Sequence, residues 1–252
     1  MNPPVNTTEA RIVDRLLEFK LTSAAEQLVS RLVAEGHAPA LSTVLEVLEA
    51  EAEARHQRRV TRLLRASKLP HGKTFECFDD TRLSAKVRRE LTNLAAGAFL
   101  DEAINVLAFG LPGVGKSHAI AALGHALVEQ GHSVLWTPTY NLVQDLLAAK
   151  RDLELPRKLR KLDQYALVIL DDIGYVKQSS EEAEVLFTLL AERYERRSTA
   201  ITSNLVFSEW DRIFKNKMAT SAAIDRLVHH SVVLEFAVPS YRTAKAKNNS
   251  KA

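Results

Sequence analysis

One octapeptide constrains the fold of this chain more than any other feature. Residues 110–117 read Gly-Leu-Pro-Gly-Val-Gly-Lys-Ser and fit the pattern G-x-x-x-x-G-K-[ST] at every fixed position. Glycines let the backbone pass close to an anion, so that several N–H groups can point at phosphate oxygens. The helix that follows presents its positive amino end to the same anion. The motif therefore predicts a phosphate-binding loop between a buried strand and a helix.

Single positions of this loop predict separate roles in binding ATP and Mg²⁺. Lys116 is expected to reach the β- and γ-phosphates, and the Ser117 hydroxyl is expected to ligate Mg²⁺. The residues expected to contact the nucleotide are Gly110, Pro112, Gly113, Val114, Gly115, Lys116, Ser117 and His118. Phe75 and Phe78, just upstream, are candidates to shelter the adenine.

The chain around the motif alternates short apolar runs with helical patterns. Strands are expected at residues 105–109, 133–137, 166–170, 199–202 and 232–236. Helices are expected at residues 116–130, 139–150, 181–197 and 208–229, with a basic polar stretch at 157–161. Buried strands that alternate with amphipathic helices predict an α/β fold with a parallel sheet flanked by helices.

Polar residues follow two of these strands. An apolar strand ending in Asp171 and Asp172 predicts that Asp171 holds Mg²⁺ and that Asp172 orients the attacking water. The alternative is a pair of acids that cap a turn. Asn204 follows the next strand, where its side chain is expected to reach the γ-phosphate or the attacking water, although a turn-forming role fits the sequence equally well.

Two distal arginines, Arg226 and Arg242, are further candidates for contact with phosphate. A guanidinium is a planar, permanently charged hydrogen-bond donor. P-loop enzymes usually need such a positive charge to stabilise the negative charge of the transition state. The alternative for Arg226 is an ion pair with the adjacent Asp225 or with a neighbouring helix.

The first part of the chain has a different pattern. Residues 10–68 read as helical, and a break near Pro70 predicts a helical N-terminal domain at 1–70, an ATPase domain at 71–242 and a polar basic tail at 243–252. A late helix of the first domain carries basic residues with no acid between them: Arg55, Arg58, Arg59, Arg62, Arg65 and Lys68.

These cations recur at helical spacing and predict a basic stripe on one helix face. Few aromatic residues accompany them, which favours contact with the backbone of duplex DNA, independent of base sequence and sensitive to salt. The alternative is a helix face that is simply solvated.

Other features exclude several classes of protein. The net charge is only +3, and no apolar run approaches the roughly 20 residues of a membrane helix. Without a secretory signal, and with Cys77 as the single cysteine, the chain is expected to be cytoplasmic, with no disulfide framework and no cysteine-rich zinc site. His229 and His230 are not expected to bind metal, because adjacent helical residues point in different directions and no third ligand is near in the sequence.

In their order along the chain, several segments resemble the AAA+ ATPases, in the branch that holds the IstB-type transposition helper and the DnaC-type helicase loader. The resemblance to the IstB type is the closer one. The matching segments are residues 66–70, 73–79, 110–118, 170–175, 193–198, 202–205, 207–210, 223–230 and 240–242.

The resemblance implies roles that the residues alone leave open. Asn204 would be sensor 1, Arg226 an arginine finger that acts on the ATP of a neighbouring subunit, and Arg242 the sensor 2 arginine. It also implies sequence-nonspecific binding of duplex DNA, an ATP- and DNA-dependent homo-oligomer and a cognate transposase as partner. Asp172 departs from the family pattern, since many such ATPases carry Glu there.

Three other functions stay open. A helicase loader would share the fold and differ in its partner. A small-molecule kinase is disfavoured, because the sequence offers no evident acceptor-binding acid or lid. A DNA-coating protein with degenerate ATPase activity would keep the nucleotide site but turn over little ATP.

Overall fold

The structure is a computed structural model of the whole chain, and it describes residues 7–174, 179–205, 209–210 and 227–241. The chain divides into two compact units, residues 1–61 and 62–252. The division falls inside one long helix, α3 (Ala40–Ser67), so it precedes the domain boundary near Pro70 that the sequence predicts. Each unit is described by itself.

The first unit is helical. It holds α1 (Thr8–Glu18), α2 (Thr22–Ala34) and the first part of α3. The Thr7 side chain accepts a hydrogen bond from the N–H of Ala10 and caps α1. The three helices share a small core made of Ile12, Leu16, Ala25, Leu41 and Leu45. Ile12 and Leu16 of α1, and likewise Leu41 and Leu45 of α3, are four residues apart and therefore lie on one face of their helix.

The second unit is built on a parallel sheet. Within the described residues, five strands lie in the order β2-β3-β4-β1-β5, and every neighbouring pair is parallel. The strands are β1 (Asn105–Gly110), β2 (Val134–Pro138), β3 (Leu167–Ile173), β4 (Ser198–Ser203) and β5 (Ser231–Phe236). All five strands predicted from the sequence are confirmed, with bounds that move by at most three residues.

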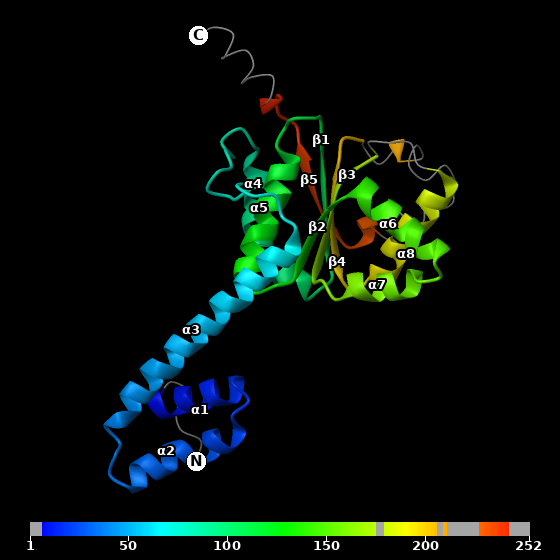
Figure 1. Cartoon of the computed structure of the whole chain (residues 1–252). Coiled ribbons are helices and arrows are strands. Elements are labelled where there is room, and N and C mark those ends of the chain that lie inside the picture. Colours follow the sequence, from blue (N-terminus) through cyan, green and yellow to red (C-terminus); the bar gives the residue numbers. More distant parts are fainter. Residues whose placement is uncertain (1–6, 175–178, 206–208, 211–226, 242–252) are drawn as a thin grey trace. The chain divides into compact units, whose positions relative to one another are not determined.

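Helices cover both faces of this sheet (Figure 1). One face carries α4 (Ala85–Ala95) and α5 (Lys116–Glu129). The other carries α6 (Thr139–Arg151), α7 (Leu155–Asp163) and α8 (Ser180–Arg193). A short 3-10 helix, η1 (Ala98–Leu100), precedes β1. The predicted α/β class with flanking helices is therefore confirmed.

The helix α7 was missed by the sequence pattern, which marked this region only as basic and polar. Its apolar residues Leu155, Leu159 and Leu162 do recur at spacings of four and three, and Leu162 is buried. Charged side chains occupy the remaining positions, so the average hydrophobicity of the segment is low. A helix that covers the outside of a sheet with one narrow apolar stripe is easily mistaken for a loop.

The middle of the sheet forms the core. Val106, Leu107 and Ala108 of β1 and the run from Leu167 to Leu170 of β3 are fully buried. Strands buried on both faces need apolar residues at consecutive positions, which explains the unbroken runs in the sequence. No helix in the described part of the chain is long and apolar enough to cross a membrane.

A buried guanidinium ties together the edge of the sheet that lies away from the P-loop. Arg193, at the end of α8, is only 2% exposed, and burial lowers its pKa to about 10. It donates hydrogen bonds to the carbonyls of Leu162, Tyr165 and Ser198 and to the Thr199 hydroxyl. These partners lie at the end of α7, just before β3 and at the start of β4, so one side chain ties the α7–β3 connection to the α8–β4 connection.

Candidate nucleotide site

The P-loop lies where β1 ends and α5 begins. A side chain at Gly110 would not fit, because its β-carbon would lie 2.6 Å from the backbone oxygen of Phe236 on the neighbouring strand β5. Gly115 takes a left-handed conformation at φ 98° and is the N-cap of α5, with no side chain capping the helix. The first N–H groups of α5 are therefore not taken by a cap, as an anion site at a helix terminus requires.

Lys116 is held inside the loop. It is 7% exposed, and its Nζ donates hydrogen bonds to the carbonyls of Gly110, at 2.7 Å, and Leu111, at 2.9 Å. The ammonium thus lies within the curve of the loop backbone. An ammonium that is largely removed from water attracts a phosphate more strongly than an exposed one.

Asp171 and Asp172 differ in their surroundings. The Thr202 hydroxyl donates a hydrogen bond of 2.7 Å to Asp171 Oδ1 and accepts one of 2.8 Å from the backbone N–H of Asp172. Thr202 lies on β4, between the strands that carry the P-loop and the two acids. Asp171 is half-buried, whereas Asp172 is exposed, in a left-handed conformation with φ 60°. The pairing of β3 with β4 shifts in register here, and this shift turns consecutive acids in different directions.

Asn204 follows β4, at the same edge of the sheet as the P-loop. Its Oδ1 is buried and has no hydrogen-bond partner among the described residues. A buried amide oxygen without a partner is costly in a folded protein and is often found where a ligand or water binds. This observation agrees with the predicted contact between Asn204 and the phosphate or the attacking water.

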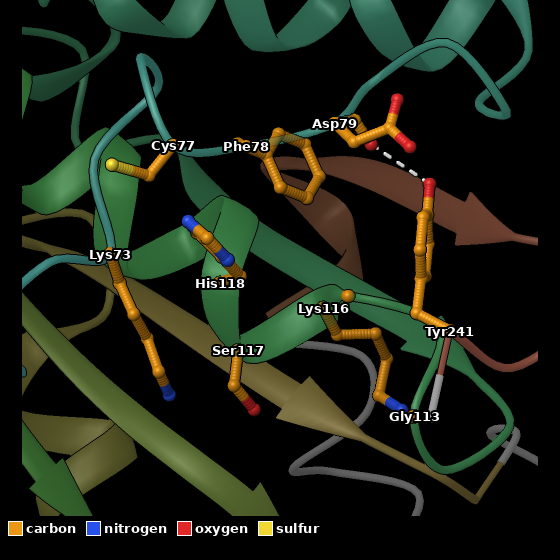
Figure 2. A pocket seen from close by; sticks show the side chains of 10 residues that line it. Lys73, Cys77, Phe78, Asp79, Gly113, Lys116, Ser117, His118 and Tyr241 are labelled. Carbon is orange, nitrogen blue, oxygen red and sulfur yellow. Dashed lines mark hydrogen bonds between the residues drawn. The ribbon is translucent and has the colours of Figure 1, made fainter. Parts of the chain in front are cut away.

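A cavity of about 450 Å³ opens beside the P-loop (Figure 2). Its lining comes from three segments that are far apart in the sequence: residues 73–79, the P-loop and Tyr241. The residues that line it are Lys73, Cys77, Phe78, Asp79, Gly113, Gly115, Lys116, Ser117, His118 and Tyr241. Its size lies within the usual range for small-molecule pockets.

Tyr241 joins two walls of this cavity. Its backbone N–H donates to the carbonyl of Gly113, and its hydroxyl donates a hydrogen bond of 2.8 Å to the carbonyl of Asp79 (Figure 2). The guanidinium of Arg82 lies 4.7 Å from the centre of the Tyr241 ring. Burial, followed by the nearby Asp79 carboxylate, raises the pKa of Tyr241. The hydroxyl therefore stays protonated and keeps its donor role.

Residues 70–79 run along α5, which brings Phe78 to the cavity. Nε2 of His125 lies 3.1 Å from the carbonyl of Pro70, and Nε2 of His118 lies 3.2 Å from the carbonyl of Thr74. The rings of Phe78 and His118 are 5.0 Å apart. Gly124 allows this approach, since a β-carbon there would lie 2.7 Å from the Leu69 side chain.

The sequence predicted the loop, His118 and Phe78 as parts of this site but missed Thr202, Lys73, Cys77, Asp79 and Tyr241. These residues lie in segments that carry the family resemblance, but no role was predicted for them, because contacts across the fold bring each of them to the site. Arg226 and Arg242 lie outside the described residues.

The oxygen atoms that these residues offer fit the binding of ATP with Mg²⁺. Ser117 offers a hydroxyl and Asp171 a carboxylate, and Mg²⁺ prefers such hard oxygen ligands. The buried oxygen of Asn204 adds a further polar group at the same edge. No other cofactor class is suggested by these residues.

The predicted basic stripe on α3 is partly neutralised. Glu51 accepts hydrogen bonds from Arg55, at 2.7 Å, and Arg58, at 3.0 Å. The bond from Arg55 is the main cause that lowers the pKa of Glu51. The Arg55 guanidinium also lies 4.1 Å from the centre of the Phe19 ring. These contacts belong to the first unit and occupy two of the predicted DNA-binding residues.

The remaining predicted DNA contacts are exposed. Arg59 is exposed in the first unit, and Arg62, Arg65 and Lys68 are exposed in the second. No structural fact on these residues identifies DNA as the partner, so DNA binding stays a prediction.

A family model and individual relatives identify the same protein family for this chain. Residues 13–252 match the family described as IstB-like ATP binding protein. An insertion-sequence ATP-binding protein of Sinorhizobium fredii is 44% identical over 209 residues, which cover 82% of this chain and 70% of the relative. An insertion-sequence ATP-binding protein of Pseudomonas aeruginosa is 40% identical over 195 residues, which cover 77% of this chain and 74% of the relative.

Solved structures show the same fold at low sequence identity. The DnaC helicase loader aligns with a TM-score of 0.53 at 18% identity and covers 69% of this chain and 98% of the loader. AMPPCP-bound DnaA from Aquifex aeolicus aligns with a TM-score of 0.55 at 16% identity and covers 72% of this chain and 56% of DnaA. These likenesses show that the fold is shared.

Proposed function

The chain belongs to the IstB-like ATP-binding proteins, and from this premise we propose that it is an ATPase that assembles on duplex DNA and recruits or activates its transposase. The single observation that carries the proposal is the P-loop with its buried Lys116, placed at the same edge of the sheet as Asp171 and Asn204. The homologues are insertion-sequence ATP-binding proteins, which makes a transposase the natural partner.

In the proposed reaction, water attacks the γ-phosphate of ATP, and ADP and phosphate leave. Lys116 and the N–H groups of the loop bind the phosphates and stabilise the charge that develops on their oxygens. Ser117 and Asp171 would hold Mg²⁺, which neutralises charge on the phosphates when bound. Asp172 orients the attacking water, and Asn204 contacts the water or the γ-phosphate.

Two further steps rest on residues outside the described ranges. We assign Arg242 to the ATP of its own chain and Arg226 to the ATP of a neighbouring subunit. A site divided between two subunits makes nucleotide binding depend on assembly, so ATP would act as an assembly signal on DNA.

The exposed cations of the last part of α3, and Lys68 just after it, would supply the DNA contact. Arg59, Arg62, Arg65 and Lys68 are placed to contact phosphates, which releases counterions and makes affinity fall with salt. Contacts of this kind carry no base specificity. We therefore propose sequence-nonspecific binding of duplex DNA.

The decisive experiment measures ATP turnover with and without duplex DNA, together with assembly on that DNA. The unmodified protein should hydrolyse ATP faster and form oligomers when duplex DNA is present. Lys116→Ala should abolish nucleotide binding and DNA-dependent assembly. Lys161→Ala, which removes an exposed lysine on α7, is the matched control and should leave both unchanged. The proposal would be contradicted if duplex DNA left the rate of ATP turnover unchanged and the protein stayed monomeric in the presence of that DNA.

A helicase loader is the second candidate, and the fold shared with the DnaC helicase loader is the observation that favours it. The two functions differ in partner. A capture experiment that offers the transposase and the replicative helicase side by side separates them: retention of the transposase supports the first function, and retention of helicase alone supports the second.

A further inference from the structure

Two histidines and a glutamate meet on the surface of the second unit. Their potential ligand atoms, one from each of Glu195, His229 and His230, all lie within 4.8 Å of one another. The sequence pattern predicted that His229 and His230 do not bind metal, because the side chains of adjacent helical residues point in different directions and no third ligand was near in the sequence. Both reasons fail in the structure: the two rings lie 4.4 Å apart, and Glu195 arrives from a distant part of the chain.

Local backbone geometry brings the three side chains together. Residues 227–229 are helical and His230 stands in the turn before β5, so the chain leaves the helical path between the two histidines. Glu195 follows α8 in a left-handed conformation with φ 56°, which is uncommon for a residue other than glycine. Its Oε1 lies 3.7 Å from Nε2 of His230.

From this cluster we propose that Glu195, His229 and His230 form a binding site for a divalent transition-metal ion of the Zn²⁺ class. Two imidazoles and one carboxylate are ligands that such ions prefer, whereas Mg²⁺ prefers oxygen ligands alone. Bonds of about 2.0–2.2 Å to an ion place its ligand atoms about 3–3.5 Å apart. Each side chain is exposed, so small rotations suffice to contract the cluster to that size. Water or a group from another molecule completes the coordination.

A neighbouring hydroxyl orients one of the ligands. Tyr194 Oη lies 3.3 Å from Nδ1 of His229, which leaves Nε2 of His229 for the ion. With the metal on Nε2, Nδ1 carries the proton and donates to the tyrosine oxygen. Histidine ligands of metals usually donate their second N–H in this way, and the partner fixes the ring and its tautomer.

The site would tie together the two connections that lead into β4 and β5. The strand β1 lies between these strands, and Asn105 at its start bonds to both sides: its N–H donates to the carbonyl of His230, and its Oδ1 accepts from the N–H of Thr199. The ion would reinforce this junction. The junction is at the amino ends of the strands, the opposite edge from the P-loop, so the metal does not depend on the nucleotide.

Zinc titration of the untagged full-length protein in metal-free buffer tests the proposal. Isothermal titration calorimetry should give one Zn²⁺ per chain, and bound Co²⁺ should show the visible absorption of a coordinated ion. His229→Gln and Glu195→Gln should each weaken binding about tenfold or more, because even changes to groups behind metal ligands cost that much. His37→Gln, at an exposed histidine of the first unit, should have no effect.

Thermal unfolding gives a second readout. Zn²⁺ at a hundredfold excess over its Kd should raise the Tm by about 5 °C or more, and Glu195→Gln at the same Zn²⁺ concentration should reduce the rise by about half or more. Millimolar Mg²⁺ should not displace the ion. Absence of Zn²⁺ binding, or equal binding by all three variants, would overturn the site and leave Glu195 and His230 as an ion pair.

Discussion

Single side chains decide how the acids of the candidate site are presented. Thr202 lies on β4 and contacts both Asp171 and the backbone of Asp172, which belong to the neighbouring strand β3. One hydroxyl therefore sets the orientation of the proposed magnesium ligand and the position of the residue that would orient water. Thr202 is 1% exposed, so no solvent molecule can replace these bonds without a rearrangement.

Thr202→Val removes this hydroxyl at nearly constant volume. We expect ATP turnover to fall about tenfold or more, because Asp171 and the backbone N–H of Asp172 both lose their hydrogen bond to Thr202 and the proposed magnesium ligand is no longer held in position. Thr202→Ser, which restores the hydroxyl, should recover most of the activity. Steady-state kinetics and thermal melting on the same samples separate a catalytic loss from unfolding; unchanged turnover in the valine variant would show that the contact is only structural.

Tyr241→Phe removes the hydrogen bond to Asp79 and keeps the ring. We expect the affinity for ATP to fall about two- to tenfold, the usual range for one neutral hydrogen bond. Burial raises the pKa of Tyr241 above its ordinary value of 10.0, so the stabilisation from this bond is complete below pH 10.0 and is lost as the pH rises through the raised pKa. Titration with a fluorescent ATP analogue at several pH values measures both effects. Equal affinities of the two proteins at neutral pH would exclude Tyr241 as a closing contact.

Helices of this protein show how local patterning can mislead. The basic residues of α3 recur at helical spacing, yet Glu51 stands one turn before Arg55 and accepts hydrogen bonds from two of them. Glu51 lies just before the uninterrupted run of basic residues. The run by itself therefore suggested a larger positive charge than this part of the helix carries. The helix α7 shows the opposite error, since its many charges concealed a narrow apolar stripe.

Glu51→Gln should strengthen binding to duplex DNA. Without the carboxylate, Arg55 and Arg58 become available to phosphates, and the slope of log affinity against log salt should steepen by about one to two. Fluorescence anisotropy over a series of salt concentrations provides the measurement. Glu53→Gln is the matched control, because it also removes one negative charge but its partner is Gln57 and not an arginine. An equal gain in the two variants would mean that only net charge matters.

The molecule combines a small helical unit with a larger α/β unit built on a parallel sheet. Its nucleotide site lies at the carboxyl ends of the strands, where parallel sheets usually bind ligands. The proposed function needs a second subunit, because Arg226 is assigned to a neighbour. Activity should therefore depend on the assembly and not on the single chain.

A mixture of two inactive variants tests this arrangement. Asp172→Asn removes the proposed water-orienting acid but keeps the P-loop lysine and nucleotide binding, and Arg226→Ala removes the proposed finger, so each protein alone should be inactive. Mixed in equal amounts on duplex DNA, they should recover about one quarter of the turnover, because one interface in four pairs an intact acid with an intact arginine. Asp172→Asn mixed with Arg242→Ala should stay inactive, since both groups are assigned to the same chain. Failure of the first mixture would place Arg226 in its own subunit or outside the reaction.

The amino-acid sequence by itself determined the parts whose signals are local. The P-loop is a contiguous motif, the strands are short apolar runs, and both follow from steric and hydrophobic rules that act within a few residues. For that reason the parallel α/β fold and the position of Lys116 were predictable, and the five strands lie where the pattern placed them.

Only the tertiary structure decided which distant residues share a site. Tyr241 reaches Asp79 across 162 positions, Thr202 reaches Asp171 across 31, and Glu195 joins two histidines that the sequence left without a third ligand. Such pairs depend on strand order, register and the path of connections, which no local pattern encodes. Local chemistry therefore identified the phosphate loop, whereas the packing of the chain set its surroundings and brought together the proposed metal site.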